Sequence, residues 1–347
     1  MDRNSILLTG LEKSMLGMEI GASFNPLASK KAGWNVKVVD HAPRDVLREK
    51  YKSRSDINID QIEEVDVVWQ TKTLHECFDA ADHHSFDYCL ASHLIEHIPD
   101  LLSFLHSLET LLKPNGVLSL AIPDKRFEFD AFKPISTTAD VLQAHKQRHQ
   151  ATRHSAKVLF ENIAYNVTNG EALIWPQIPI NDLKVFSSFS ETHRVFETDL
   201  DDPAEPYHDC HAWYFTPSSF RLMMTELRAL GKTRFVVERL VPSQGSEFYV
   251  RMRLDGKKDA AAQLPSNDER MALMLAILAE QAQQYSLVGD ALRQRLIKLL
   301  PEEHPFPGGN SNTGMIEQLL NSHSWRLVTA FWTNVDKVKK ILRPRKE

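Results

Sequence analysis

Histidine and acidic side chains follow an apolar run in the first third of the chain. His93 comes directly after residues 86–92 (FDYCLAS), and Glu96 and His97 follow within one helical turn. An imidazole in such a place can take the proton of a substrate hydroxyl, which contributes about 10²–10⁴-fold to a rate. Two histidines four residues apart sometimes bind a metal ion. No further pair in the chain has ligand spacing, so the sequence predicts no metal site.

A second charged group follows the apolar run at 117–122. Asp124 is a catalytic candidate at the end of that run, and Lys125 and Arg126 could hold a phosphate or carboxylate of a substrate. The alternative is a cluster of ion pairs that anchors the next segment. His211 is a further substrate-binding candidate, for which structural packing is the alternative.

A glycine turn near the amino terminus favours a small bound ligand. Glu19 and Gly21 stand where a first strand gives way to the next element, and glycine lets backbone approach a ligand closely. The pattern G-x-G-x-x-G is absent, because Ser23 and Pro26 occupy its later positions. We therefore expect a small zwitterionic ligand rather than a pyrophosphate.

Two acids follow at the spacing expected for a nucleoside. Asp40 ends an apolar run about twenty residues after the turn and could accept hydrogen bonds from both ribose hydroxyls. Asp66, with Val67, is interpreted as the end of a third strand, where it could meet an adenine amino group. The alternatives are a helix cap for Asp40 and an ordinary surface acid for Asp66.

The elements that position these residues alternate between short apolar runs and helical patterns. Such alternation predicts a parallel sheet with crossover helices. The predicted strands cover residues 15–20, 36–40, 63–68, 86–92, 117–122 and 211–215, then an antiparallel pair at 235–240 and 248–254. The predicted helices begin near 26 and cover 44–51, 101–112, 138–149, 155–166 and 216–230.

This pattern predicts one large domain and a helical appendage. The domain covers 1–256 and is interrupted by an insertion at 125–206, rich in histidine and arginine, that we interpret as a lid over the acceptor. The appendage covers 266–347.

Composition excludes several classes of protein. The net charge of -5 argues against nucleic acid as a partner. The sequence has neither the layout of a signal peptide nor a run of 18 apolar residues. Its three cysteines are far apart, so we expect a cytoplasmic protein.

Taken together, several segments resemble class I S-adenosylmethionine (SAM) methyltransferases in order and spacing. They are 19–21 (EIG), 39–40 (VD), 86–93 (FDYCLASH), 95–98 (IEHI), 112–117 (LKPNGV) and 211–217 (HAWYFTP). The resemblance covers about 1–125 and 208–255. It implies an α/β fold with a Rossmann-like, seven-stranded mixed sheet, a helical insertion and a helical C-terminal appendage, and SAM as the cofactor.

The resemblance also implies roles for single residues. The methionine part of SAM lies beside Glu19, Gly21, Ala22 and Ser23, the ribose beside Asp40, the adenine beside Asp66 and Val67, and the acceptor side of the cofactor beside Ala91, Ser92 and His93. Ser23 departs from the family, which usually has a second glycine there.

Residues 122–130 (IPDKRFEFD) resemble methyltransferases found among bacterial surface-polysaccharide biosynthesis enzymes. The expected acceptor is therefore a hydroxyl on a sugar or polysaccharide intermediate. The alternatives are a small-molecule or lipid methyltransferase and a non-catalytic scaffold that keeps the SAM fold. A nicotinamide-dependent oxidoreductase is disfavoured, because the glycine pattern differs.

The tail predicts a basic amphipathic helix. Apolar side chains recur at three- and four-residue steps from Trp325 to Leu342, with lysine and arginine between them. This layout is typical of a helix in a membrane interface, so residues 325–346 are predicted to contact the inner face of the plasma membrane. Docking on protein is the alternative. Residues 322–331 also resemble a tail of some polysaccharide glycosyltransferases, which makes such enzymes candidate partners.

Overall fold

A computed structural model describes part of the chain. The described residues are 2–70, 72–147, 154–197, 208–256, 264–289 and 292. The chain divides into two compact units, one of Met1–Gln177 with Lys184–Ile277 and one of Ile178–Leu183 with Leu278–Glu347. Every candidate site residue lies in the first unit. The predicted basic tail helix lies outside the described residues.

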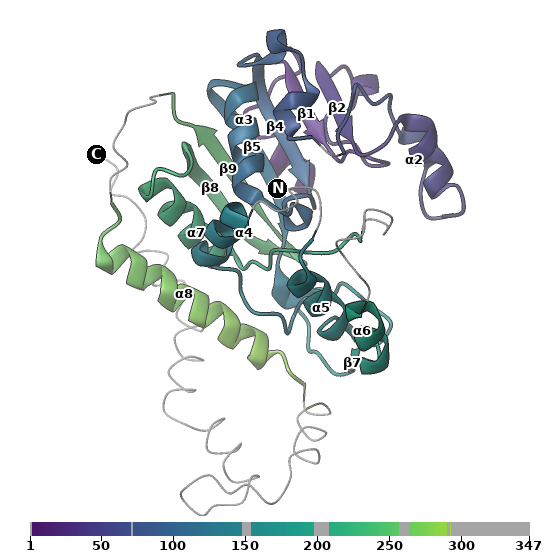
Figure 1. Ribbon diagram of the computed structural model, residues 1–347, viewed down its shortest axis with the longest axis vertical. Coiled ribbons are helices and arrows are strands. Elements are labelled where there is room, and N and C mark those ends of the chain that lie inside the picture. Colours follow the sequence, from purple (N-terminus) through teal and green to yellow (C-terminus); the bar gives the residue numbers. More distant parts are fainter. Residues whose placement is uncertain are drawn as a thin grey trace, which may run out of the picture. The chain divides into compact units, whose positions relative to one another are not determined.

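A seven-stranded sheet organises the first unit (Figure 1). Its strands lie in the order β3-β2-β1-β4-β5-β9-β8. Neighbours from β3 to β5 are parallel, and β9 is antiparallel to both β5 and β8. The strands are β1 (Gly17–Ile20), β2 (Val36–Asp40), β3 (Val67–Val68), β4 (Phe86–Ser92), β5 (Leu112–Pro123), β8 (Phe235–Gln244) and β9 (Glu247–Leu254). The predicted mixed α/β sheet is confirmed.

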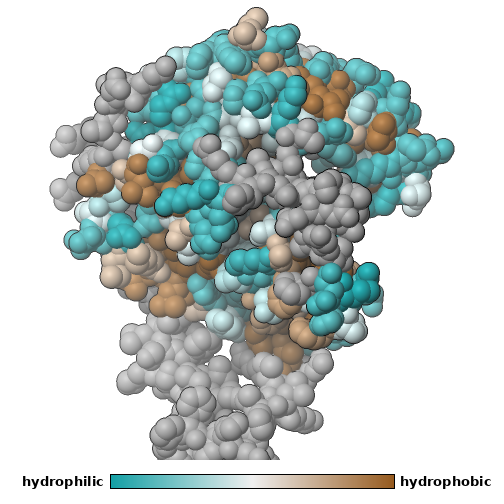
Figure 2. Space-filling view, viewed as in Figure 1, coloured by the Kyte–Doolittle hydropathy of each residue, from teal (hydrophilic) through white to brown (hydrophobic). Residues whose placement is uncertain are grey.

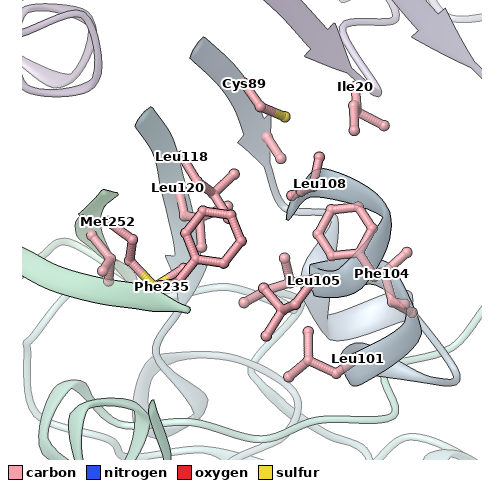
Figure 3. Packing of buried hydrophobic residues seen from close by; sticks show 14 of the residues in the cluster. Ile20, Cys89, Leu101, Phe104, Leu105, Leu108, Leu118, Leu120, Phe235 and Met252 are labelled. Atoms are coloured by element: carbon pink, nitrogen blue, oxygen red, sulfur yellow. The ribbon is translucent and has the colours of Figure 1, made fainter. Parts of the chain in front are cut away.

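The core lies between this sheet and two helices, α3 (Leu101–Leu111) and α7 (Pro217–Ala229). Figure 3 shows Leu101, Phe104, Leu105 and Leu108 of α3 packed against strand side chains. Parallel strands covered on both faces should be apolar throughout, which explains why β4 and β5 are so nearly continuous in apolar residues. Helix α7 begins as the sequence predicts, with the Thr216 side chain accepting from Ser219 N–H.

The remaining elements complete the two units. The helices are α1 (Arg3–Leu7), α2 (Arg44–Tyr51), α4 (Thr138–Gln147), α5 (Ala156–Ala164), α6 (Phe189–Phe196) and α8 (Asn267–Ser286). A small sheet joins β6 (Val167–Asn169) to β7 (Leu183–Val185). Hydrophilic and hydrophobic side chains both reach the face drawn in Figure 2. None of the helices described is long and apolar enough to cross a membrane.

Two expected elements are absent from the described residues. The segment 211–215 is not a strand: Ala212 N–H donates to Glu96 O, and Lys125 N–H donates to Phe215 O. Its aromatic side chains Trp213 and Phe215 are buried in the same core as those of α3 and α7, although the segment pairs with no strand. No α-helix begins near Pro26, where the chain makes only a short 3-10 turn at Lys30–Ala32.

The strand order sets the place of the site. Strand β1 pairs with β2 on one side and with β4 on the other, so the order of the sheet reverses there. In open α/β sheets, ligands bind beyond the carboxyl ends of the strands at such a point. Gly21 and His93, which follow β1 and β4, therefore flank the expected crevice.

Candidate active site

The glycine turn is held by a buried carboxylate. Glu19 is 3% exposed, and its two oxygens accept from Leu27 N–H at 2.7 Å and Ala28 N–H at 2.8 Å. These bonds draw the loop back over β1, which explains why no helix begins at Pro26. Burial raises the pKa of Glu19 to about 7. Glu19 thus shapes the loop through its side chain.

The loop after β1 contains two residues in left-handed backbone conformations. Gly21 has φ of 72°, a left-handed conformation that glycine adopts without strain, and Ser23 has φ of 44°. Ala22 between them is buried. Among the described residues, the Ser23 hydroxyl is buried without a hydrogen-bond partner. A buried polar atom of this kind fits a cofactor that supplies the missing bond.

Asp40 lies at the carboxyl end of β2, beside this loop. It is 4% exposed; Oδ2 accepts from Ser23 N–H at 3.3 Å, and Oδ1 accepts from His41 N–H at 2.7 Å. Oδ1 also lies 2.6 Å from His41 Nδ1, so Oδ2 is the oxygen with a lone pair left for a ribose hydroxyl. The structure therefore brings Gly21, Ser23 and Asp40 together.

Asp66 lies elsewhere. Strand β3 begins after Asp66 and does not end at it, and Asp66 Oδ2 accepts from Val38 N–H at 2.6 Å and from Lys30 Nζ at 2.5 Å. Trp69 and Gln70 follow the strand and reach the carboxyl edge, where Trp69 N–H donates to Asp40 O. The roles of Asp66 and Val67 toward adenine stay predictions. The only signal in the sequence that could have identified Trp69 and Gln70 is the end of strand β3, which directly precedes them.

We expect the substitution Asp40→Ala to weaken binding of SAM by about 1–3 kcal/mol, the scale of lost hydrogen bonds to a charged group. Isothermal titration measures this change, with NAD as the comparison ligand. Unchanged SAM affinity in a folded Asp40→Ala protein would show that the ribose role is wrong.

His93 is held between two carboxylates beyond β4. Its Nε2 lies 2.8 Å from Glu247 Oε2, and its Nδ1 lies 3.6 Å from Glu96 Oε1. The residue has φ of 49°, a conformation that costs free energy in a residue other than glycine and is common at functional sites. Its side chain is 37% exposed. The preceding residues Ala91 and Ser92 lie at the end of β4, beside β1 and β5.

Glu247 orients the imidazole and is itself oriented by Arg3, whose Nε donates to Glu247 Oε1 at 2.7 Å. Burial alone would raise the pKa of Glu247, but the bonds from His93 and Arg3 outweigh it and lower that pKa to about 2. Burial lowers the pKa of His93, but the Glu247 bond and the negative charges of Glu96 and Glu247 together outweigh it, so this pKa is raised.

Sequence reasoning missed Arg3 and Glu247, because they lie 244 residues apart in the chain. Strand β9 runs antiparallel to β5 and pairs Glu247 with Pro123. The first residue of β9 therefore lies at the carboxyl edge of the parallel strands. No local pattern in the sequence marks this placement.

The charged group after β5 is buried and paired. Asp124 is 0% exposed; its Oδ1 accepts from Arg126 Nε at 2.9 Å, and Ser243 Oγ donates to its Oδ2. Lys125 donates from Nζ to Ala131 O at 2.8 Å, and burial lowers the pKa of Lys125 to about 8. These contacts favour the ion-pair alternative, while catalysis by Asp124 and acceptor binding by Lys125 and Arg126 stay predictions.

A second cluster surrounds His211. Its Nδ1 lies 2.5 Å from Asp130 Oδ2, and Asp130 Oδ1 lies 2.5 Å from Lys133 Nζ. The rings of His211 and His97 lie 4.6 Å apart at 88°. The loop at 211–213 is bound to the backbone of Glu96, so this cluster adjoins the His93 site. Acceptor binding by His211 stays a prediction.

Comparison with known proteins agrees with this geometry. A family model described as a methyltransferase domain matches residues 12–227, more than half of the chain. The ubiquinone biosynthesis O-methyltransferase of Actinobacillus pleuropneumoniae serotype 7 (strain AP76) is 34% identical over 110 residues, which cover 30% of this chain and 44% of that protein. The chain thus spans less than half the length of this curated relative.

Solved structures add only distant likenesses. The PH0226 protein of Pyrococcus horikoshii OT3 is 16% identical, with 72% of this chain and 86% of that chain covered and a TM-score of 0.36. A SAM-dependent methyltransferase from Aquifex aeolicus is 13% identical, with coverages of 71% and 85% and a TM-score of 0.32. The fold assignment therefore rests on the strand order and the family match. On those grounds the chain belongs to the methyltransferase family that this domain model describes, with S-adenosylmethionine as its cofactor.

Proposed function

We propose that this methyltransferase acts on an oxygen atom, a hydroxyl of a sugar or polysaccharide intermediate. The observation that carries the proposal is His93, an imidazole fixed by Glu247 at the carboxyl end of β4 and still 37% exposed. A hydroxyl is a weak nucleophile until its proton is removed, and His93 is placed to remove it.

The reaction is an in-line displacement. SAM supplies a methyl group on a positively charged sulfur. With SAM bound, His93 would accept the hydroxyl proton as the acceptor oxygen takes the methyl group. Nε2–H of His93 donates to Glu247, which leaves Nδ1 as the basic nitrogen. Alignment of the reacting atoms at about 3–3.5 Å supplies much of the rate.

Two further observations support oxygen and a sugar as acceptor. The curated relative is named as an O-methyltransferase. Residues 122–130 resemble enzymes of surface-polysaccharide synthesis. The relative's name also makes a small-molecule acceptor a full alternative. A scaffold without turnover is the remaining alternative.

The test is a product analysis with separated acceptor pools. The protein and SAM are incubated with lipid-linked sugars, free glycans or small phenols, and products are identified by mass and fragmentation. We expect O-methylated sugars. Methylated phenols alone would favour the small-molecule alternative, and SAM binding without turnover on any pool would favour the scaffold.

We also propose that the tail at 325–346 binds the membrane surface, where lipid-linked intermediates are assembled. Residues 326–347 hold seven basic and two acidic side chains, a local charge of +5. Each basic group near an anionic bilayer contributes about 1 kcal/mol, which salt screens. The full chain should therefore sediment with anionic liposomes at low salt and release as salt rises. A chain ending at Pro301 should stay in solution and bind SAM; failure of the full chain to sediment would contradict the proposal.

A further inference from the structure

Glu96 is the most unusual charged side chain of the first unit. It is 0% exposed, and among the described residues neither of its carboxylate oxygens has a hydrogen-bond partner. The nearest cationic candidates, His93 Nδ1 and His97 Nε2, lie 3.6 and 3.9 Å from Oε1, beyond hydrogen-bonding distance. A buried carboxylate without a partner costs several kcal/mol, so this position calls for a cation.

Two histidines present nitrogen atoms to the same place. One oxygen of Glu96 and one ring nitrogen each of His97 and His211 lie within 4.8 Å of one another. Metal–ligand bonds of about 2.0–2.2 Å put ligand atoms roughly 3–4 Å apart. Side-chain shifts of about 1 Å would therefore close the three atoms around an ion.

An acid lies close to Nδ1 of each ring. Nδ1 of His211 lies 2.5 Å from Asp130 Oδ2 and is hydrogen-bonded to it. Nδ1 of His97 lies 2.8 Å from Asp209 Oδ1, within ion-pair distance, but makes no hydrogen bond among the described residues. Metal-binding histidines almost always donate their second ring N–H to such a partner, which leaves the other nitrogen's lone pair for the ion. His211 has this arrangement, and Asp209 lies close enough to His97 to provide it there.

A neighbouring group of Glu128, Asp130 and His211 is a weaker candidate for a metal site. Glu128 and Asp130 also lie close to His211, but the Lys133 ammonium is 2.5 Å from Asp130 and already supplies a positive charge there. Glu96 has no lysine or arginine within salt-bridge distance among the residues described.

We propose that Glu96, His97 and His211 bind a divalent transition-metal ion, with Zn²⁺ as the probe. Two imidazoles and a carboxylate suit zinc and leave at least one coordination position open. His93, whose Nδ1 lies 3.6 Å from Glu96, adjoins that position. If the proposed O-methylation holds, the ion binds the acceptor hydroxyl and makes its proton easier to remove. Only this last consequence rests on the proposed function.

The test measures metal binding without acceptor or turnover. The untagged full chain is dialysed against Zn²⁺ and its metal content is determined, and Co²⁺ is added separately to record the visible absorption of a bound ion. We expect one Zn²⁺ per chain. Glu96→Gln and His211→Asn should each weaken binding at least 100-fold. Asp209→Asn should weaken it about 10–100-fold, as outer partners do.

His193→Asn is the matched control, because His193 also lies near an acid, 3.9 Å from Glu197, but both side chains are exposed. It should leave Zn²⁺ binding unchanged. Glu96→Gln removes an uncompensated charge and so should not destabilise the metal-free protein, which separates ligand loss from misfolding. Less than one Zn²⁺ per chain, or binding that survives Glu96→Gln, would overturn the proposal. If the chain binds one Zn²⁺ but methylates no sugar, the metal site is supported and only the proposed acceptor is rejected.

Discussion

Replacing His93 with asparagine is expected to lower kcat by about 10²–10⁴-fold while SAM affinity changes little. Asparagine tolerates the left-handed backbone of residue 93 and cannot act as a base, so the change isolates the loss of proton transfer. Single-turnover rates with an unmethylated acceptor, together with titration of SAM, measure the two quantities separately.

His84→Asn is the control for this experiment. His84 has a similar φ of 54° and precedes β4, at the opposite end of that strand from the site. Its substitution should leave kcat within a few-fold of the original value. A His93→Asn protein with near-normal kcat would exclude the proposed base and leave positioning alone as the source of the rate.

Replacing Gly17 with alanine is expected to lower the free energy of unfolding by at least about 3 kcal/mol. A Cβ at residue 17 would lie 2.0 Å from Cζ of Tyr88, whose ring is fully buried on the neighbouring strand. Packed interiors have no free space into which an aromatic ring can move. Denaturant unfolding followed by circular dichroism measures the change.

Two variants of Tyr88 show whether this contact is the cause. Tyr88→Phe keeps the ring and removes a hydroxyl that has no partner among the described residues, so it should be close to neutral. Tyr88→Ala is destabilising alone, but adding Gly17→Ala to it should cost much less than Gly17→Ala costs in the original chain. If the two substitutions lowered the free energy of unfolding additively, the contact with Tyr88 would not be the cause.

Much of the fold could be predicted because the buried strands carry a strong local signal. Strands β2 and β4 are apolar nearly throughout and begin and end at the predicted residues. Thr216 and Pro217 likewise mark the start of α7. The segment 211–215 is also largely apolar and lies in the same core, yet its backbone bonds to loops, since an apolar run specifies burial and does not specify its hydrogen-bond partners.

The site was less predictable, since its contacts join distant segments. Gly21, Asp40 and His93 could be located because each lies at the carboxyl end of a parallel strand or directly after it. These strand ends meet at one edge of the sheet. The bond from His93 to Glu247 depends on the register of β9 against β5, which local sequence does not encode. Glu96 and His211 lie close together because the loop at 211–213 donates hydrogen bonds to the backbone of Glu96. The spacing of these residues along the chain could not reveal this contact.

The bond between Arg3 and Glu247 has a practical consequence for recombinant work. Arg3, in the first turn of α1, also donates to the Ser92 hydroxyl, one residue before His93. The third residue of the chain thus lies against the reaction centre, although nothing in its neighbourhood in sequence suggests a role there. Arg3 should therefore be kept in every variant, because its loss would disturb the alignment of His93 through Glu247.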